Sequence, residues 1–426
     1  MKRKTIILLV LYIMSVIAGC SDPVDIAPKE EVKATPTPTA AAPTPTKEVI
    51  PPERELLDKL TLEQKLGQIL IAGIPKGSTI EQIREYVDDF KAGGFILYPR
   101  NYSSLEEMYR LIAAIKDFNK DNPLALFVST DEEGGTVSRL PKGAIKFPDA
   151  RLIGRVNKPA ITARVGEVMG RELSAFGVNM NFAPVLDIVN SSENRFLYKR
   201  TFGGSADIVS AHGAAFIAGL QSRQVIAVAK HFPGHGATTV DSHGKLPVID
   251  IDKDILINRE LAPYTHCFDQ GLEAVMVGHL AFPNVDPSGL PSSMSKVLLT
   301  DILRKELGFK GLVIMDDIEM YGFLGQGGSF EASVIQAFNS GVDVFLVCHT
   351  RKVQNQVLEA LKTGVADGRI SMERLDEAVM RVISLKLKYK LTDDMKYSLE
   401  EVKQYIGKGE NKVFYDTLMR EIEKVK

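Results

Sequence analysis

The sequence has few cysteines, little net charge and no apolar run long enough to span a membrane comfortably. Cys20, Cys267 and Cys348 are its three cysteines, which are too few for a disulfide framework in a chain of 426 residues. The last two lie in apolar segments, so we expect buried free thiols. The formal net charge is only −2, so we expect neither a nucleic-acid partner nor a broadly basic, membrane-binding surface. Function must therefore be argued from a local site.

The N-terminal segment has the layout of an export signal. Basic residues precede an apolar run over Ile6–Ala18, and this run is short for a membrane span. It ends in Ile17-Ala18-Gly19-Cys20, which resembles the lipobox of bacterial lipoproteins, in which the cysteine is lipidated. We therefore expect a signal peptide over 1–19 and a lipid anchor at Cys20. The alternative is an ordinary signal peptide with a chance cysteine.

The next segment is dominated by proline, threonine and alanine. Residues 20–50 include the near-repeats TPTPT and PTPT. A tract of this composition cannot bury a core and is typical of an extended tether. We therefore expect a lipid-anchored linker over 20–50 and one folded domain over 51–426, exported and held at the membrane facing the cell wall or periplasm.

Short apolar runs alternate with longer amphipathic stretches through the folded part. The runs are rich in Val, Ile, Leu and Phe without strict alternation, which is typical of parallel strands buried on both faces. They cover Gly67–Ala72, Gly94–Tyr98, Ala125–Thr130, Val178–Pro184, Ile226–His231, Ala274–His279, Gly311–Asp316 and Val342–Cys348. Helix-like stretches follow them, for example over Leu105–Lys120, Asp207–Arg223 and Ser293–Leu307.

Eight such strand and helix pairs predict an α/β fold, a (β/α)₈ barrel of the TIM type. The alternative, an open doubly wound sheet, requires a glycine-rich phosphate turn near the first strand, and Ala72–Gly77 matches that turn poorly. The tail from Ser371 to Lys426 is expected to form two or three further helices on the outside of the barrel.

A barrel of this kind places its chemistry at the carboxyl ends of the strands. Polar residues stand at several of these predicted ends, namely Asp131, Asp187, Lys230, His231, His279, Asp316 and Asp317. We therefore expect these side chains to meet at the barrel mouth.

The predicted seventh strand ends in two carboxylates. Asp316 follows the apolar run GLVIM directly, so its side chain is a candidate nucleophile or metal ligand. The alternative is a helix N-cap, because aspartate is favoured there. With Asp317 next in the chain, both roles can be filled at once.

The most informative stretch is KHFPGHG followed by DSH, which brings three of the seven histidines within thirteen positions. Asp241 can orient His243 and raise its basicity, which suits a proton shuttle. A metal site of His231, His235 and His243 is the competing interpretation. The intervening Pro-Gly forbids the helical spacing that usually holds two such ligands, so we favour the Asp241–His243 dyad and expect neither a metal nor a cofactor.

Two further segments carry candidate sugar-binding residues. Asp131 begins the motif DEEGG, and a carboxylate there can accept hydrogen bonds from sugar hydroxyls, although a plain acidic turn is the alternative. Arg200 lies in a long loop after the fourth strand. Long loops at the active face of a barrel are often functional, and a guanidinium there can clamp a carboxylate or a pair of hydroxyls.

Taken together, these motifs resemble family 3 glycoside hydrolases, specifically the bacterial β-N-acetylglucosaminidases of peptidoglycan recycling. The resemblance runs from about Leu56 to about Leu391, and KHFPGHG with DSH is its most specific part. It implies that His243, held by Asp241, is the acid/base. It also implies that Asp316 is the nucleophile of a retaining reaction. The substrate-binding positions that it implies are Asp131, Arg139, Arg200, Lys230, His231 and His279.

The resemblance leaves fine substrate preference open. Glu132, Thr201 and Met315 stand where the family usually has Gln, Ser and Ser or Thr, but none of these departures removes a reacting group. The expected substrate is a carbohydrate, and terminal β-linked N-acetylglucosamine of peptidoglycan fragments is favoured. The alternatives are a β-glucosidase or β-xylosidase of the same family, and a sugar-binding lipoprotein without catalysis.

Overall fold

The computed structural model describes residues 51–324 and 329–426. The expected signal peptide, the lipidation site Cys20 and the tether over 20–50 lie outside the described residues. In the described part, no helix is both long enough and apolar enough to cross a membrane.

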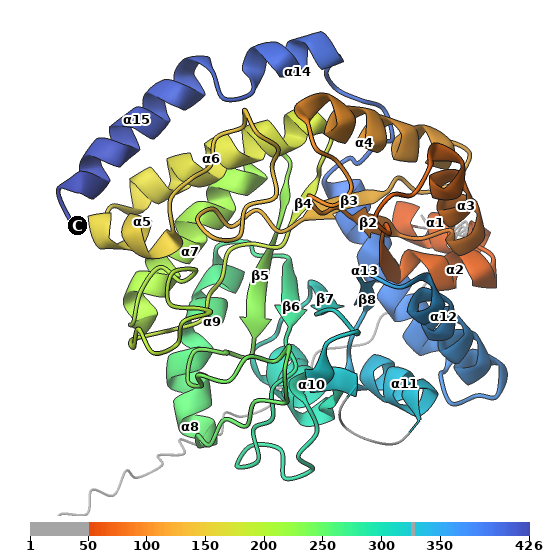
Figure 1. Ribbon diagram of the computed structural model, residues 1–426. Helices are drawn as coiled ribbons and strands as arrows, with labels where there is room; N and C mark the ends of the chain where they lie inside the picture. Colours follow the sequence, from red (N-terminus) through yellow and green to blue (C-terminus); the bar gives the residue numbers. More distant parts are fainter. Residues whose placement is uncertain (1–50, 325–328) are drawn as a thin grey trace, which may run out of the picture. The chain divides into compact units, whose positions relative to one another are not determined.

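Eight parallel strands close into a barrel in chain order, β1 beside β2 and onward until β8 pairs with β1 (Figure 1). The strands are β1 (Leu70–Gly73), β2 (Gly94–Ile96), β3 (Phe127–Thr130), β4 (Met180–Asn181), β5 (Ile226–Phe232), β6 (Ala274–Val277), β7 (Leu312–Met315) and β8 (Val344–Val347). Each one falls within or overlaps an apolar run identified in the sequence. The prediction of a (β/α)₈ barrel is therefore confirmed.

Helices surround the barrel and cover its strands (Figure 1). In the first half of the chain they are α1 (Pro52–Lys59), α2 (Leu62–Gln68), α3 (Ile80–Phe90), α4 (Leu105–Asn119), α5 (Ala150–Val156), α6 (Pro159–Phe176) and α7 (Ala206–Gln221). They continue with α8 (Lys253–Ile255), η1 (Leu256–Glu260), α9 (Ala262–Asp269), η2 (Ser292–Met294), η3 (Val297–Glu306), α10 (Tyr321–Leu324), α11 (Phe330–Ser340) and α12 (Arg351–Ala366). The last three are α13 (Met372–Lys388), α14 (Leu399–Tyr405) and α15 (Gly409–Glu423).

Hydroxyl side chains fix where several helices begin. The side chains of Thr61, Thr79 and Ser398 accept a hydrogen bond from the backbone N–H of the third residue of α2, α3 and α14. The side chain of that third residue in turn accepts a hydrogen bond from the backbone N–H of the capping residue. This reciprocal capping box satisfies two backbone donors that the helix leaves free. Such caps set the helix starts, and at α3 the cap fixes where the loop after β1 ends.

The barrel interior is a packed apolar core. Its inward-facing side chains come from alternate strand positions, as Leu312 and Ile314 do on β7, and form a cluster separate from the one between strands and helices. Val382, Leu385 and Tyr389, on and just after α13, belong to this interior cluster. Helix α13 therefore packs against one end of the barrel core, which differs from the expectation that the C-terminal helices all lie outside.

Lys386 ties α13 to the amino-terminal ends of the strands. Its ammonium donates to Gln68 Oε1 at 2.6 Å and to the carbonyl of Gly93 at 2.9 Å, just before β1 and β2. Burial lowers the pKa of Lys386 to about 7. Helix α13 thus closes the amino-terminal end, while the carboxyl ends of the strands open to the loops.

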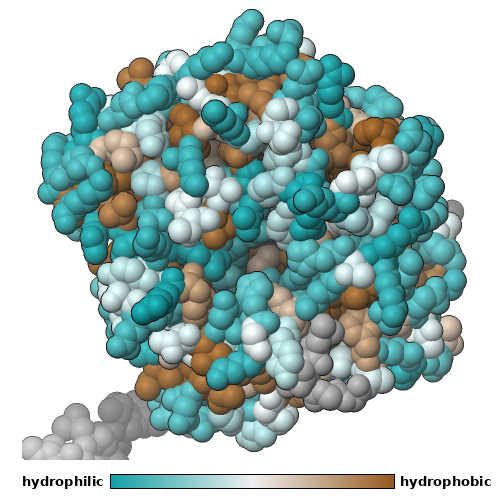
Figure 2. Space-filling model, in the orientation of Figure 1, coloured by the Kyte–Doolittle hydropathy of each residue, from teal (hydrophilic) through white to brown (hydrophobic). Residues whose placement is uncertain are grey.

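Helices α14 and α15 lie on the outside, across α4, α5 and α6 (Figure 1). They are anchored by apolar residues, including Val402, Leu418 and Ile422. Hydrophilic residues cover most of the face of the molecule seen in Figure 2, and hydrophobic residues form small separate groups there. For these two helices, the expectation of packing outside the barrel is met.

Candidate active site

A cavity of about 330 Å³ lies at the carboxyl ends of the strands. It gathers side chains from β5, β6 and β8 and from the segments that follow β2, β3, β4, β5, β7 and β8. Its polar lining includes Tyr98, Asp131, Glu133, Arg139, Arg200, Lys230, His231, His235, Asp241, His243, Asp316, Asp317 and His349. The expected catalytic and sugar-binding residues of the folded part all line it except His279, and Asp187, also expected at the barrel mouth, is buried behind the lining.

Asp316 stands at the end of β7 and faces this cavity. Its backbone N–H donates to the carbonyl of Val277 on β6 at 3.0 Å, and its Oδ1 accepts from the N–H of Asp317 at 2.8 Å. Burial alone favours the neutral acid, but attraction to His231 and His279 and the Asp317 hydrogen bond outweigh it and lower the pKa of Asp316. The carboxylate is therefore anionic, as a nucleophile must be.

Asp317 plays a different role from Asp316. Its Oδ1 accepts from the N–H of Cys348 on the β8 side at 3.1 Å and from the N–H of Glu319 at 3.3 Å. The next helix, α10, begins only at Tyr321. Asp317 therefore makes the local turn contacts and ties two strand ends together, which leaves Asp316 without a capping role.

Lys230 is the centre of a buried charge cluster. Its ammonium lies 2.6 Å from Asp131 Oδ1 and 2.8 Å from Glu133 Oε1. Arg200 clamps Glu133 with two hydrogen bonds of 2.8 Å. Burial disfavours the charge on Lys230, but Asp131 and Glu133 reverse that effect and raise its pKa. Glu133 thereby holds Lys230 and Arg200 in place, and Asp131 keeps a partly exposed carboxylate in the cavity.

Asp187 orients the histidines of the KHFPGHG motif. Its carboxylate lies 2.8 Å from His231 Nδ1 and accepts from the N–H of His235 at 2.6 Å. Asp187 is buried, and although burial raises its pKa, the attraction to His231 together with these hydrogen bonds lowers it overall. The contact fixes the ring plane of His231 and directs Nε2 away from Asp187.

The Asp241–His243 dyad is formed in the loop after β5. His243 Nδ1 lies 2.7 Å from Asp241 Oδ1, and the backbone N–H of His243 donates to the same oxygen at 3.0 Å. The His243 side chain is 76% exposed and that of Asp241 48%. Desolvation raises the pKa of Asp241, but the hydrogen bonds from His243 lower it overall. The pairing leaves Nε2 of His243 free to exchange a proton with a substrate.

His279 is placed differently from the other expected site residues. Its ring is fully buried, with Nδ1 2.8 Å from Ser293 Oγ and Nε2 3.2 Å from the backbone carbonyl of Asp317. Burial lowers its pKa. In this arrangement His279 supports the turn at Asp316 and Asp317 from the side away from the cavity. Its expected contact with a sugar stays a prediction.

Several residues of the site were not singled out from the sequence. In the sequence, Glu133 stands out only as part of the DEEGG motif, and Asp187 only as a carboxylate at a predicted strand end. His349 lies directly after the β8 run, 3.2 Å from Asp317 Oδ2, and stacks on Tyr98 with 5.8 Å between ring centroids. Position after a strand was the available signal for Asp187 and His349. No pattern in the sequence pairs Glu133 with Arg200, 67 residues away.

The described residues include no group of three His, Cys, Asp or Glu side chains arranged to hold a metal ion. Cys267 and Cys348 are buried and free, as expected. Burial raises the pKa of the Cys267 thiol to about 12, so this sulfur stays protonated and unreactive at neutral pH.

The fold and the site together define a class of protein. A strand-end carboxylate held as an anion, an imidazole paired with its own aspartate, and a charged cluster suited to sugar hydroxyls share one cavity in a barrel. This combination of side chains is that of a glycoside hydrolase active site.

Comparison with known proteins gives the family. Residues 61–385 match the model of the glycosyl hydrolase family 3 N-terminal domain. The chain belongs to this family, and the prediction of a family 3 glycoside hydrolase is confirmed.

Named relatives are consistent with this assignment. A beta-hexosaminidase of Methylococcus capsulatus is 34% identical over 286 residues, covering 66% of this chain and 83% of that protein. A beta-hexosaminidase of Vibrio cholerae is 35% identical over 280 residues, covering 65% and 82%. The solved structure of a family 3 beta-N-acetylglucosaminidase from a Paenibacillus species superposes with a TM-score of 0.78 at 33% identity, covering 85% of this chain and 69% of that one.

Proposed function

We propose that this family 3 glycosidase is an exo-acting, retaining β-N-acetylhexosaminidase that removes terminal β-linked N-acetylglucosamine. The observation that carries the proposal is that Asp316 and the Asp241–His243 dyad line the same cavity. The names of the relatives as beta-hexosaminidases support the choice of sugar.

In the first step, an oxygen of Asp316 attacks the anomeric carbon and forms a glycosyl ester. The bond to the leaving oxygen breaks, and protonated His243 gives its Nε2 proton to that oxygen. Asp241 accepts the Nδ1–H of the same ring throughout and stabilises the imidazolium before transfer. The charge cluster around Lys230 holds the sugar through its hydroxyls.

In the second step, neutral His243 takes a proton from water through Nε2. The water oxygen attacks the anomeric carbon, the ester bond to Asp316 breaks, and the carboxylate is restored. Two inversions give net retention of the β configuration. The imidazole replaces the second carboxylate of the usual pair, so no second negative charge is needed close to Asp316.

The proposed natural substrate is a fragment of peptidoglycan, and the proposed place of action is outside the cytoplasmic membrane. The lipobox-like sequence at Cys20 and the composition of residues 20–50 support export and anchoring. An anchored enzyme meets wall-derived sugars rather than cytosolic ones.

Proton NMR of the reaction on a chromogenic β-N-acetylglucosaminide tests the proposal. We expect the β-anomer of the free sugar to form first, and an α-anomer would contradict the scheme. Faster hydrolysis of the matching β-glucoside would favour a β-glucosidase instead. Activity on neither sugar would favour a binding protein.

The Asp316→Asn variant tests the nucleophile. We expect turnover to fall by at least a thousandfold, because the amide cannot form the ester. The Asp367→Asn variant, which changes an exposed aspartate far along the chain, serves as the matched control and should keep full activity. Near-full activity in Asp316→Asn would disprove the assignment.

A further inference from the structure

A second recess, which we call the basic groove, lies away from the active site. It consists of two adjoining cavities of about 470 and 550 Å³ that share Gly308, Phe309, Lys310 and Arg381. It runs beside α13 and along the segments that lead into β6 and β7. These are the amino-terminal ends of the strands, opposite the active-site cavity.

The groove is lined by an excess of cations. Its basic side chains are Arg304, Lys305, Lys310, Arg374, Arg381 and Lys388, and its acidic ones are Glu273 and Glu377. Two more carboxylates pair with this set from outside the lining, Asp301 with Lys305 and Asp343 with the arginines. Six positive charges against four negative ones leave a surplus of two.

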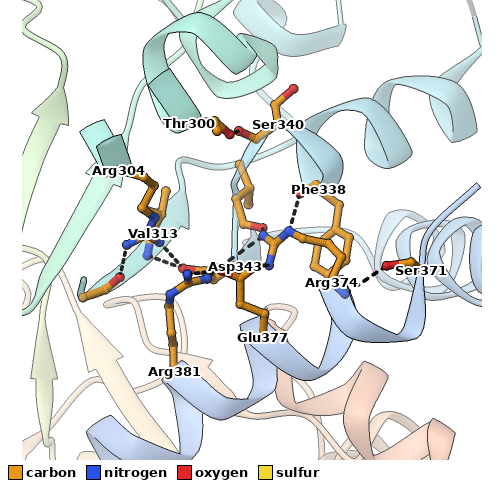
Figure 3. A network of polar contacts seen from close by, with 12 residues as sticks. Thr300, Arg304, Val313, Phe338, Ser340, Asp343, Ser371, Arg374, Glu377 and Arg381 are labelled. Carbon is orange, nitrogen blue, oxygen red and sulfur yellow. Dashed lines mark hydrogen bonds and ion pairs between the residues drawn. The ribbon is translucent and has the colours of Figure 1, made fainter. Parts of the chain in front are cut away.

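Three of the guanidinium groups converge on one buried carboxylate (Figure 3). Asp343 lies 2.6 Å from Arg304 Nη2, 2.8 Å from Arg381 Nη1 and 3.2 Å from Arg374 Nη2. One carboxylate cannot neutralise three guanidinium groups, and Glu377 adds one charge, paired with Arg381 and Arg374. The cluster therefore keeps positive charge at the wall of the groove.

Among the described residues, one basic side chain of the groove has no carboxylate partner. It is not Arg374, whose buried Nη1 makes no hydrogen bond but lies 3.6 Å from Glu377 Oε2. Lys310 is exposed, and no ion pair involves it within the described residues. An anion in the groove would pair with the exposed ammonium group of Lys310.

The groove also offers an apolar floor. Phe268 and Phe309 stack with ring centroids 4.4 Å apart, and Leu272 and Met380 lie in the same lining. A single small anion would use the cations but not this floor. A chain that alternates anionic groups with carbon-containing units would use both.

We propose that the basic groove binds an extended polyanion whose units are linked by phosphate groups. Guanidinium and ammonium groups are the usual protein partners of phosphate oxygens, and their spread along the groove fits several phosphates in succession. Because the groove and the active site lie at opposite ends of the barrel, both can be engaged at once. The proposal goes beyond the glycosidase activity and does not depend on it.

Isothermal titration of the full-length protein with polyphosphate of defined chain length, which probes the phosphate contacts without the apolar floor, tests the proposal. The Lys305→Glu/Lys310→Glu variant reverses two exposed charges of the groove and leaves the buried arginines in place. We expect its dissociation constant for polyphosphate to rise at least tenfold. We also expect wild-type binding to weaken as salt is raised, because ion pairing is screened.

The matched control is Lys120→Glu/Lys362→Glu. It makes the same charge change at two exposed lysines outside the groove. Lys120 pairs with Asp117, and no ion pair involves Lys362 in the part of the chain that the structure describes. Its affinity for polyphosphate should equal that of the wild type, and both variants should hydrolyse the chromogenic glycoside normally. Equal affinity in all three proteins would overturn the proposal. Binding to anionic lipid vesicles but not to polyphosphate would also overturn it and would indicate a membrane contact.

Discussion

Single residues of the active site differ in how firmly the protein holds them. Lys230 and His231 have little exposed surface and are each fixed by buried carboxylates, whereas the His243 side chain is 76% exposed. An exposed imidazole depends on its partner for orientation, because little packing restrains it. Asp241 is therefore the residue whose loss should affect proton transfer most selectively.

We expect Asp241→Asn to lower kcat by about 10²–10⁴-fold with little change in KM. The amide can no longer accept the Nδ1–H as an anion, so the imidazolium that delivers the proton is less stable. Steady-state kinetics on the chromogenic β-N-acetylglucosaminide would measure this. Loss of binding with unchanged kcat would instead place Asp241 among the sugar-binding residues.

Glu132 is buried beside the active site, and no ion pair involves it within residues 51–324 and 329–426. Its Oε2 accepts from the N–H groups of Arg139 and Leu140 at 2.6 and 3.0 Å, while Oε1 has no hydrogen-bond partner. Burial raises the pKa of Glu132 to about 7. An unfolded glutamate has a pKa of about 4.3. Between these values the folded protein holds a proton that the unfolded chain has lost, so the contribution of Glu132 to stability falls as pH rises towards 7.

The Glu132→Gln variant should remove this penalty. We expect its free energy of unfolding to match the wild type near pH 4 and to exceed it at pH 8 by on the order of 2 kcal/mol. Thermal melts at both pH values would show the difference as a few °C. A gap in melting temperature that does not change with pH would contradict the assignment.

Sequence alone located most residues that carry the chemistry, since Asp316, Lys230 and His231 each end an apolar run. It could not predict which carboxylate serves which cation. Glu133 meets Arg200 only after the chain has crossed from the β3 loop to the β4 loop. His279 occupies a strand end like the others, yet its ring turns into the core, because Ser293 and the Asp317 carbonyl offer it hydrogen bonds there.

At the scale of elements, the three arginines around Asp343 join parts that are distant in sequence. Arg304 comes from η3, Arg374 and Arg381 from α13, and Asp343 immediately precedes β8. Asp343 also accepts from the N–H of Val313 on β7 at 3.0 Å. This carboxylate therefore holds α13 against the amino-terminal end of the barrel.

We expect Asp343→Asn to destabilise the protein by about 3 kcal/mol or more, because it leaves buried guanidinium charge without its acceptor. Chemical denaturation followed by circular dichroism would measure the loss. The control, Asp367→Asn, breaks an exposed ion pair with Arg369 and should leave the denaturation midpoint unchanged. Equal midpoints for both variants would show that the network carries no stability.

Strand positions were predictable because apolar runs mark buried parallel strands, but their ends were not. The run Val178–Pro184 yields only Met180–Asn181 as β4. Pro184 has no N–H to donate to a ladder, and beyond it the pairing with β5 continues only as an isolated bridge between Val185 and Lys230. The first apolar run begins at Gly67, but in the structure Gly67 belongs to α2. A Cβ atom at this position would lie only 2.2 Å from the carbonyl oxygen of Lys91. Position 67 therefore requires glycine because of the neighbouring backbone and not because a strand begins there, and the local sequence pattern does not show this.

At the scale of the whole molecule, the C-terminal helices divide into two groups. Val382 and Leu385 of α13 pack into the barrel core, whereas α14 and α15 cover the outer helices α4, α5 and α6. The two groups should therefore differ in how far folding and catalysis depend on them.

Deletion of residues 399–426 should lower the melting temperature by several degrees, since it uncovers apolar residues such as Leu418 and Ile422. We expect kcat of the folded fraction to be kept, because these helices do not line the active-site cavity. Deletion from residue 372 should prevent folding, because it also removes α13. Calorimetry and kinetics on both truncations test this, and a folded, active protein without α13 would contradict the role given to that helix.

The closure of the barrel by α13 also has a consequence for how sugars enter and leave the active-site cavity. The barrel interior is a packed apolar core that Val382, Leu385 and Tyr389 complete at the far end, so among the described residues no passage runs from the active-site cavity through the barrel, and sugar enters and leaves on the side of the strand ends. A released monosaccharide therefore stands in the path of the next chain end. For the proposed exo-glycosidase, we therefore expect that a glycan strand does not pass through the barrel and that each cleavage requires a new binding event.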